Sequence, residues 1–233
     1  MNITKNQLAK SLDHSLLMPT VTDDDVRTGC DIACRHHVAS VSVKPSHIEL
    51  AASLLRGSDV LVGTTIGFPH GCSTTGVKVY EVKDALGRGA QEFDMVMNVG
   101  LFLSGRYDDV RTDISAVKRA VGRDRILKAI IEFGYLNEEQ IVKACQLVEA
   151  AGADFVKSSS GFAPNLTTLE VVRLMRHSVG PHVQVKAAYG IRDYDTVMAM
   201  LEAGASRVAV RCTEEVMKTW DERRTHSQPG ASS

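Results

Sequence analysis

The sequence predicts an α/β protein in which eight strands and eight helices alternate in a single (β/α)₈ barrel. Short apolar segments rich in β-branched residues alternate with longer amphipathic segments along the 233-residue chain. Glycine marks several helix ends, and Ala151-Gly152-Ala153 and Ala203-Gly204-Ala205 form the same helix-to-strand junction. No linker or break in composition occurs before about residue 225. This uninterrupted alternation is the pattern of a closed parallel TIM barrel.

The strands are predicted where apolar, β-branched residues form short runs. These runs are Leu12–Leu17, Ser40–Lys44, Val60–Ile66, Glu92–Asn98, Ile126–Glu132, Phe155–Ser159, Gln184–Ala188 and Arg207–Cys212. Helices are expected near residues 23–36, 46–56, 75–88, 107–121, 137–151, 167–178, 193–203 and 213–224, and several begin at a capping residue such as Thr22 or Asn137. An open, doubly wound sheet is the alternative, but it usually carries a Gly-rich phosphate turn, and no G-x-G-x-x-G or P-loop is present.

Composition and charge restrict the class of protein. Hydrophobic residues make up 44% of the chain and the formal net charge is −1, which argues against a general affinity for nucleic acid or anionic membranes. The five cysteines are an odd number without framework spacing, and the first residues lack the apolar core of a signal peptide. We therefore expect a cytoplasmic protein with one barrel domain over residues 1–224 and a disordered tail over 225–233.

Ionisable residues inside the apolar strands are the most informative feature. They are Asp13, Asp94, Lys128, Lys157 and Lys186. Any one of them alone is compatible with an outward-facing or snorkelling side chain. Together, on different strands whose outer faces pack under helices, they predict a shared polar site near the carboxyl-terminal mouth of the barrel. The charges must compensate one another or be hydrated, since an unpaired buried charge costs several kcal/mol.

Three lysines with acidic partners point to iminium chemistry. A lysine amine is a poor nucleophile at its free pKa of about 10.4, but desolvation or a neighbouring ammonium lowers that pKa. One lysine would attack a carbonyl, a second would lower the pKa of the first, and an acid would transfer protons. The resulting iminium withdraws electrons from an adjacent carbon–carbon bond. This chemistry needs no cofactor and no metal, and no metal-ligand spacing of His, Cys and Asp is present.

These residues lie in motifs that resemble those of the 2-deoxyribose-5-phosphate aldolase family, from about residue 11 to residue 212. The matching segments occur in the family's order and at similar spacing, and they are Leu12–Leu17, Val43–Pro45, Ile66–Gly71, Glu92–Gly100, Ala150–Phe162 and Val185–Ala188. The family's class I members are TIM barrels that reversibly join acetaldehyde to glyceraldehyde 3-phosphate. The resemblance therefore implies an aldehyde-lyase with a small aldehyde and a sugar-phosphate-like substrate, and a homodimer.

Residue roles follow from the same resemblance. It implies that Lys157 forms the Schiff base and that Lys186 is the neighbour that lowers its pKa. Asp94 would relay protons with an ordered water, and Asp13 would be a supporting acid. Lys128 occupies a family active-site lysine position and would structure the charge network. The expected substrate-binding residues are Ser15, Ser42, Ser160, Gly161, Tyr189, Gly190 and Arg211.

The chain departs from the family pattern at the phosphate-binding end. Tyr189 stands where the family has one of two adjacent glycines, whose backbone N–H groups approach a phosphate closely. Arg211 replaces a turn of small hydroxyl residues after the last strand, and Ser42 stands where many members have a cysteine. Arg211 is compatible with three roles: holding a phosphate, selecting a carboxylate, or lying on the surface as a plain charge. Tyr189 either packs over the substrate tail or fills space.

Three functions therefore remain open on the sequence alone. The first is aldol cleavage of deoxyribose 5-phosphate. The second is related iminium chemistry on a non-phosphorylated or carboxylated substrate, which the changes at Tyr189 and Arg211 motivate. The third is a catalytically silent barrel that acts as a binding protein. It is disfavoured because Lys157, Lys186 and Asp94 are all present.

Overall fold

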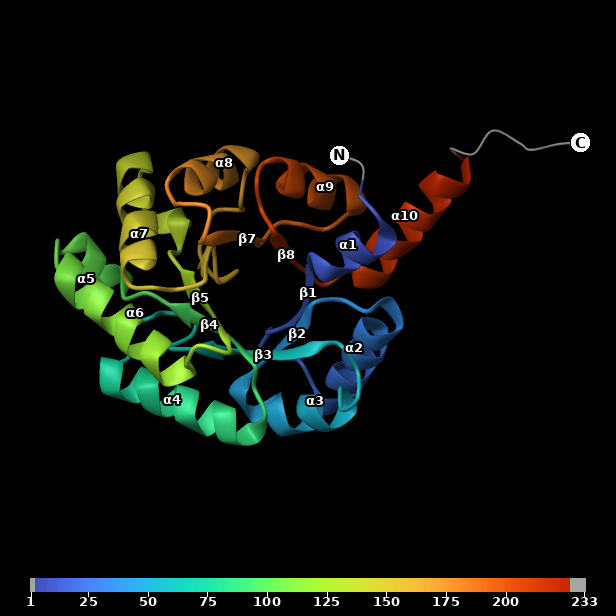
Figure 1. The fold of residues 1–233 in the computed structure, drawn as a ribbon, viewed down its shortest axis with the longest axis horizontal. Coiled ribbons are helices and arrows are strands. Elements are labelled where there is room, and N and C mark those ends of the chain that lie inside the picture. Colours follow the sequence, from blue (N-terminus) through green and yellow to red (C-terminus); the bar gives the residue numbers. More distant parts are fainter. Residues whose placement is uncertain (1–2, 227–233) are drawn as a thin grey trace, which may run out of the picture.

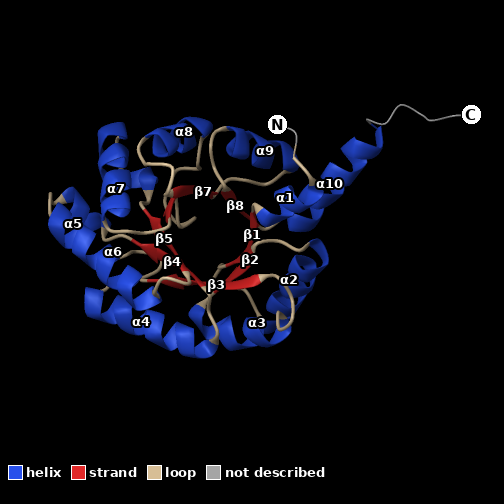
Figure 2. Ribbon diagram, viewed as in Figure 1, coloured by secondary structure: helices blue, strands red, loops and turns tan. Residues whose placement is uncertain are grey.

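The chain folds into a closed barrel of parallel strands, which confirms the fold predicted from the sequence. The computed structural model describes residues 3–226. Its strands follow chain order around the barrel, and β1 pairs with β8 to close it. Figure 2 shows the strands as an inner ring surrounded by helices. The strands are β1 Leu12–Leu16, β2 Ser40–Val43, β3 Leu61–Ile66, β4 Glu92–Val96, β5 Ile126–Ile130, β6 Phe155–Lys157, β7 Gln184–Ala188 and β8 Arg207–Val210.

The helices cover the outside of the barrel (Figure 1). They are α1 Lys5–Lys10, α2 Asp23–His36, α3 Ile48–Leu54, α4 Thr75–Arg88, α5 Val99–Leu103, α6 Tyr107–Val121, α7 Glu138–Ala150, α8 Leu169–His177, α9 Tyr194–Glu202 and α10 Thr213–His226, with short 3₁₀ turns at Pro45–His47 and Phe133–Tyr135. Helix α10 extends through His226, and residues 227–233 of the predicted tail lie outside the described residues. None of the helices in residues 3–226 is long and apolar enough to cross a membrane.

Two helices were not expected from the sequence. Helix α1 precedes the barrel and is joined to α10 by an ion pair between Lys5 and Asp221, 2.6 Å long. Helix α5 begins directly after β4, where the Asn98 side chain accepts a hydrogen bond from the Leu101 N–H and caps the helix. Because the chain turns into a helix there, β4 ends at Val96 rather than at the predicted Asn98.

Strand register brings the ionisable residues into the barrel interior in two neighbouring layers, because Lys157 lies opposite Ile130, two residues beyond Lys128. Asp94 pairs with Lys128 across β4 and β5, and Lys157 pairs with Lys186 across β6 and β7. Lys186 pairs in turn with Arg207 on β8. Paired positions in a sheet project their side chains to the same face. One inward-facing position on each of these strands therefore places all of these charged groups together.

A separate buried ion pair secures the end of β4 from outside the barrel. Lys78 on α4 is fully buried, and its Nζ lies 2.6 Å from Asp113 Oδ2 on α6. The same ammonium donates a hydrogen bond to the carbonyl of Val96, the last residue of β4. The contact ties two outer helices to the strand that carries Asp94.

Candidate active site

A chain of alternating charges crosses the barrel interior and ends at Lys157. Lys128 Nζ lies 2.9 Å from Asp13 Oδ2, and Lys186 Nζ lies 2.6 Å from the same oxygen. Lys186 Nζ also lies 2.8 Å from Asp94 Oδ2, and Lys157 Nζ lies 2.7 Å from that oxygen. These five residues include every catalytic candidate from the sequence. Together with Glu92 and Arg207, which are described next, we call them the charge cluster. The structure brings all five together.

Two further residues, Glu92 and Arg207, complete the charge cluster at its base. Arg207 Nε donates to Asp13 Oδ1 at 2.7 Å, and its Nη2 donates to both Glu92 oxygens at 2.8 Å. Lys128 donates to Glu92, and Ser40 Oγ donates to Asp13 Oδ1 at 2.9 Å. The sequence interpretation missed these two residues as site members. Glu92 was detectable because it is two positions before Asp94 and therefore on the same strand face.

Charge balance constrains how many protons the charge cluster can hold. Four of its side chains are basic and three are acidic, so full ionisation leaves one excess positive charge. All seven are buried or nearly so, and an uncompensated buried charge is costly. The excess positive charge therefore favours the loss of a proton from one amine more than it would in water. A neutral amine is what a Schiff-base nucleophile requires.

The pKa directions indicate which groups stay ionised. Burial opposes ionisation of Lys128, but Asp13, Glu92 and Asp94 outweigh it and hold its pKa above the ordinary value. Burial likewise opposes the charge on Asp94, but Lys157, Lys186 and Lys128 hold the pKa of that carboxyl well below its usual range. For Lys186 burial prevails over the attraction of Asp13 and Asp94 and lowers its pKa to about 8.

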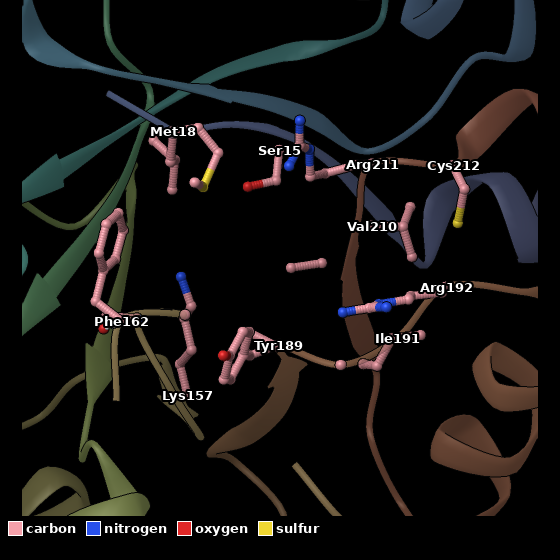
Figure 3. Close-up of a pocket in the computed structure, with 16 residues that line it drawn as sticks. Ser15, Met18, Lys157, Phe162, Tyr189, Ile191, Arg192, Val210, Arg211 and Cys212 are labelled. Carbon is pink, nitrogen blue, oxygen red and sulfur yellow. Dashed lines mark hydrogen bonds between the residues drawn. The ribbon is translucent and has the colours of Figure 1, made fainter. Parts of the chain in front are cut away.

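A cavity of about 240 Å³ opens above the charge cluster, and Lys157 reaches into it (Figure 3). The cavity is lined by residues at the ends of β1, β6, β7 and β8 and in the loops that follow them, which form the carboxyl-terminal mouth of the barrel. Lys186 and Lys128 are fully buried beneath it and do not line it. Of the three clustered amines, Lys157 is thus the one a substrate in this cavity can meet.

The turn after Lys157 is held in place from β5. Glu132 is buried, and its Oε1 accepts hydrogen bonds from Ser159 Oγ at 2.7 Å and the Ser160 N–H at 2.9 Å. Gly161 follows with φ +92°, a left-handed conformation that favours glycine, and its N–H donates to Ser159 Oγ. This network fixes the loop that forms one wall of the cavity beside the lysine.

Two guanidinium groups line the cavity on the side away from Lys157. In Figure 3, Arg192 and Arg211 lie across the cavity from the lysine, and Tyr189 lies between the lysine and Arg192. Neither arginine makes an ion pair or side-chain hydrogen bond within residues 3–226. Two unpaired cations at one end of a cavity favour an anionic ligand group there. Arg192 was not among the residues predicted from the sequence.

The substrate-binding residues predicted from the sequence mostly meet at this cavity. Its lining includes Ser15, Ser160, Gly161, Tyr189, Gly190 and Arg211. Ser42 is the exception. It is buried on β2, does not line the cavity, and its Oγ has no hydrogen-bond partner among the described residues. Met18 and Phe162, which also line the cavity, were not predicted as site residues.

The chain is similar in sequence to known proteins over most of its length. A family model described as DeoC/LacD family aldolase matches residues 7–218. The deoxyribose-phosphate aldolase of Staphylococcus epidermidis is 46% identical over 210 residues, covering 90% of this chain and 95% of that protein. The corresponding protein of Caldanaerobacter subterraneus is 42% identical over 215 residues, covering 91% and 93%.

Solved structures agree with the sequence comparison. QR15, an aldolase, superposes with a TM-score of 0.90 at 37% identity, covering 95% of this chain and 99% of its own. The deoxyribose phosphate aldolase from Aeropyrum pernix, described as having a unique tetrameric structure, superposes with a TM-score of 0.87 at 26% identity, covering 94% and 93%. Both of these aldolases thus share the overall fold of this chain. The chain belongs to the DeoC/LacD family of aldolases.

His14 lies behind the cavity wall and is held neutral. The side chain is buried, and its Nδ1 lies 2.9 Å from Thr213 Oγ1 at the start of α10. Burial, and then the positive charge of Arg211, lowers its pKa from 6.5 to about 4. Protonation of His14 is therefore resisted in the folded protein but not in the unfolded chain.

This difference in the pKa of His14 predicts that the folded protein loses stability in acid. Stability contributed by neutral His14 is complete above pH 6.5 and is lost as the pH falls toward 4, because the unfolded chain takes up a proton that the folded protein does not. Between pH 7 and pH 4.5 the loss is about 2–3 kcal/mol. Urea unfolding at both pH values should show that the free energy of unfolding of His14→Gln falls by about 2–3 kcal/mol less than that of wild type. Equal losses in the two proteins would contradict the assignment.

Proposed function

We propose that this protein is a class I aldolase that forms a Schiff base through Lys157 and reversibly cleaves 2-deoxyribose 5-phosphate to acetaldehyde and glyceraldehyde 3-phosphate. The observation that carries the proposal is the position of Lys157. It is the clustered amine that lines the cavity, and it shares one oxygen of Asp94 with the second amine, Lys186. The names of the curated relatives support the substrate.

Lys186 provides a place for the proton that Lys157 must lose. With a pKa of about 8, Lys186 is deprotonated in about one molecule in ten at pH 7 and in half of the molecules at pH 8. Both nitrogens hydrogen-bond to Asp94 Oδ2, so a proton can pass from the Lys157 ammonium to the neutral Lys186 amine across that oxygen. Lys157 is then neutral and attacks the substrate aldehyde. The carbinolamine that forms loses water to give the iminium.

The iminium then drives cleavage of the adjacent carbon–carbon bond. Its electron-poor carbon accepts the bonding pair as the bond between C2 and C3 breaks, while the C3 hydroxyl loses its proton and becomes the aldehyde of glyceraldehyde 3-phosphate. Asp94 Oδ1 accepts no hydrogen bond from the described residues and lies 3.5 Å from Lys128 Nζ. Because Asp94 is buried and does not line the cavity, we assign it this proton transfer through an ordered water. Protonation and hydrolysis of the enamine release acetaldehyde and regenerate Lys157.

The phosphate belongs at the end of the cavity lined by Arg192 and Arg211. Their unpaired guanidinium groups suit a dianionic group, and guanidinium forks bind phosphate oxygens in pairs. Ser160, Gly161 and Gly190 supply further polar and backbone groups along the wall. A carboxylate would also fit two guanidinium groups, which keeps a carboxylated substrate as the second candidate.

We propose further that the enzyme works in the cytoplasm as a homodimer. All five cysteines are free, and Cys30 and Cys145 are buried, which suits a reducing compartment. A closed two-fold dimer is the commonest soluble oligomer, whereas the relative from Aeropyrum pernix is described as a tetramer. Analytical ultracentrifugation separates the two states by mass.

The Schiff base is tested by trapping. Borohydride reduction in the presence of acetaldehyde should attach one two-carbon group to wild type, located on Lys157 by peptide mass spectrometry. Lys157→Ala should give no adduct and lose aldolase activity by several orders of magnitude, because the nucleophile is gone. Lys143→Met, at an exposed lysine on α7, is the matched control and should behave as wild type. An adduct that persists in Lys157→Ala would rule out the assignment.

The anionic tail is tested at Arg211. Arg211→Ala should weaken transition-state binding of deoxyribose 5-phosphate by about 1.5–3 kcal/mol, since a charge-assisted hydrogen bond is lost. Cleavage of unphosphorylated deoxyribose should change little. Arg88→Ala, at an exposed arginine on α4, is the control and should affect neither substrate. If Arg211→Ala affects both substrates equally, Arg211 does not contact the phosphate.

A further inference from the structure

Tyr189 has a backbone conformation that a tyrosine rarely adopts. Its φ is +81°, and the other non-glycine residues with positive φ in residues 3–226 are His37 and Glu132. Positive φ is a true outlier for a bulky side chain, since Cβ crowds the neighbouring carbonyl. Strain of this kind persists where surrounding contacts leave the backbone no alternative, and it gathers at ligand sites.

The contacts around Tyr189 leave its backbone no alternative. The residue before it, Ala188, donates its N–H to Ser158 Oγ at 3.0 Å, and its carbonyl accepts from both Ser158 Oγ and Thr167 Oγ1. The carbonyl of Tyr189 accepts from the Thr167 N–H at 3.2 Å. Gly190, on the other side, packs so closely against Leu166 that a Cβ there would lie 2.9 Å from the leucine side chain. A glycine at position 189 would meet all these contacts without strain.

The strained backbone conformation of Tyr189 directs its side chain into the cavity. The ring lines the cavity together with Lys157, and its Cδ2 lies 3.6 Å from the point where a Cβ on Gly161 would be. In Figure 3 the ring stands between Lys157 and Arg192, with its hydroxyl on the side that faces Lys157. Tyr189 therefore forms the wall of the cavity beside the path that leads from the nucleophile to the guanidinium groups.

We propose that the Tyr189 ring sets the size of the acceptor aldehyde that the enzyme accepts, an inference that rests on the proposed function. A bound substrate is fixed at both ends, by its covalent bond to Lys157 and by its anionic group at Arg192 and Arg211. An acceptor with one more carbon between these ends cannot extend along the cavity. It must buckle sideways, and the Tyr189 ring occupies the space beside the chain. The ring thus rejects acceptors longer than a three-carbon aldehyde phosphate.

The test compares two acceptors of the same charge. Aldol addition of acetaldehyde to D-glyceraldehyde 3-phosphate and to D-erythrose 4-phosphate gives a ratio of kcat/KM values for wild type. Tyr189→Gly should shift that ratio toward the longer acceptor by about tenfold or more, the scale at which a pocket discriminates one carbon. Tyr189→Phe keeps the ring and should leave the ratio within about threefold of wild type.

Melting temperatures distinguish a role of the Tyr189 ring in stability from a role in substrate selectivity. Tyr189→Gly should melt about 2–4 °C above wild type or at the same temperature, because glycine adopts this conformation freely. His37→Gly relieves strain of the same kind at the exposed end of α2, away from the cavity, and should leave the acceptor ratio unchanged. A fall of more than about 5 °C in Tyr189→Gly would show that the ring is retained for stability and would overturn the proposal.

The outcomes distinguish this inference from the proposed function. If wild type forms no aldol product with glyceraldehyde 3-phosphate, the proposed function fails. If wild type is active but Tyr189→Gly keeps the wild-type ratio, or Tyr189→Phe shifts it as far as Tyr189→Gly does, only the role of the ring fails. A shift in Tyr189→Gly alone supports the proposal.

Discussion

The oxygen atom that Lys157 and Lys186 share on Asp94 is the interaction on which the site depends. It joins the amine in the cavity to an amine sealed beneath it. Four basic and three acidic groups are buried together, so full ionisation leaves one excess positive charge, and burial lowers the pKa of Lys186 to about 8. The shared oxygen gives the Lys157 ammonium a hydrogen-bonded path to the neutral Lys186 amine.

The rest of the barrel serves to keep this arrangement rigid and dry. Lys128 and Arg207 hold Asp13 and Glu92 in fixed ion pairs at the base, so the carboxylates cannot turn away from the amines. Lys78 secures the end of β4 from outside, and Glu132 secures the turn after β6. The charge cluster is therefore held by strands and buried contacts, whereas the end of the cavity with Arg192 and Arg211 is formed by the loops after β7 and β8.

Much of this could be predicted from the sequence because the relevant patterns are local. Alternating strand and helix segments predicted the barrel, and charges inside apolar strands predicted the charge cluster. Arg207 and Glu92 were missed because each begins a strand, where a charge looks like an ordinary flanking residue. Arg192 was not predicted as a site residue, since its place in the cavity depends on the path of the loop after β7.

Other features depend on tertiary structure and have no local signature. The positive φ of Tyr189 is stabilised by contacts with Ser158 and Thr167, which lie on a different loop, and its only signal in the sequence is that Tyr189 stands where the family has a glycine. Ser42 was predicted to bind substrate, and it pairs with Ser15, which lines the cavity, but Ser42 itself is buried and does not line it. Helix α5 is short and begins inside a run of apolar residues, so it could not be separated from the strand before it.

The most direct test of the central claim is an NMR titration of ¹³C-labelled lysine side chains in wild type and in Lys186→Met. That variant keeps the charge cluster balanced, since it leaves three basic and three acidic groups. We expect one lysine of wild type to titrate near pH 8 and that titration to be absent from Lys186→Met. Titration of every wild-type lysine at or above the ordinary value of about 10.4, or persistence of the pH 8 titration in Lys186→Met, would contradict the account.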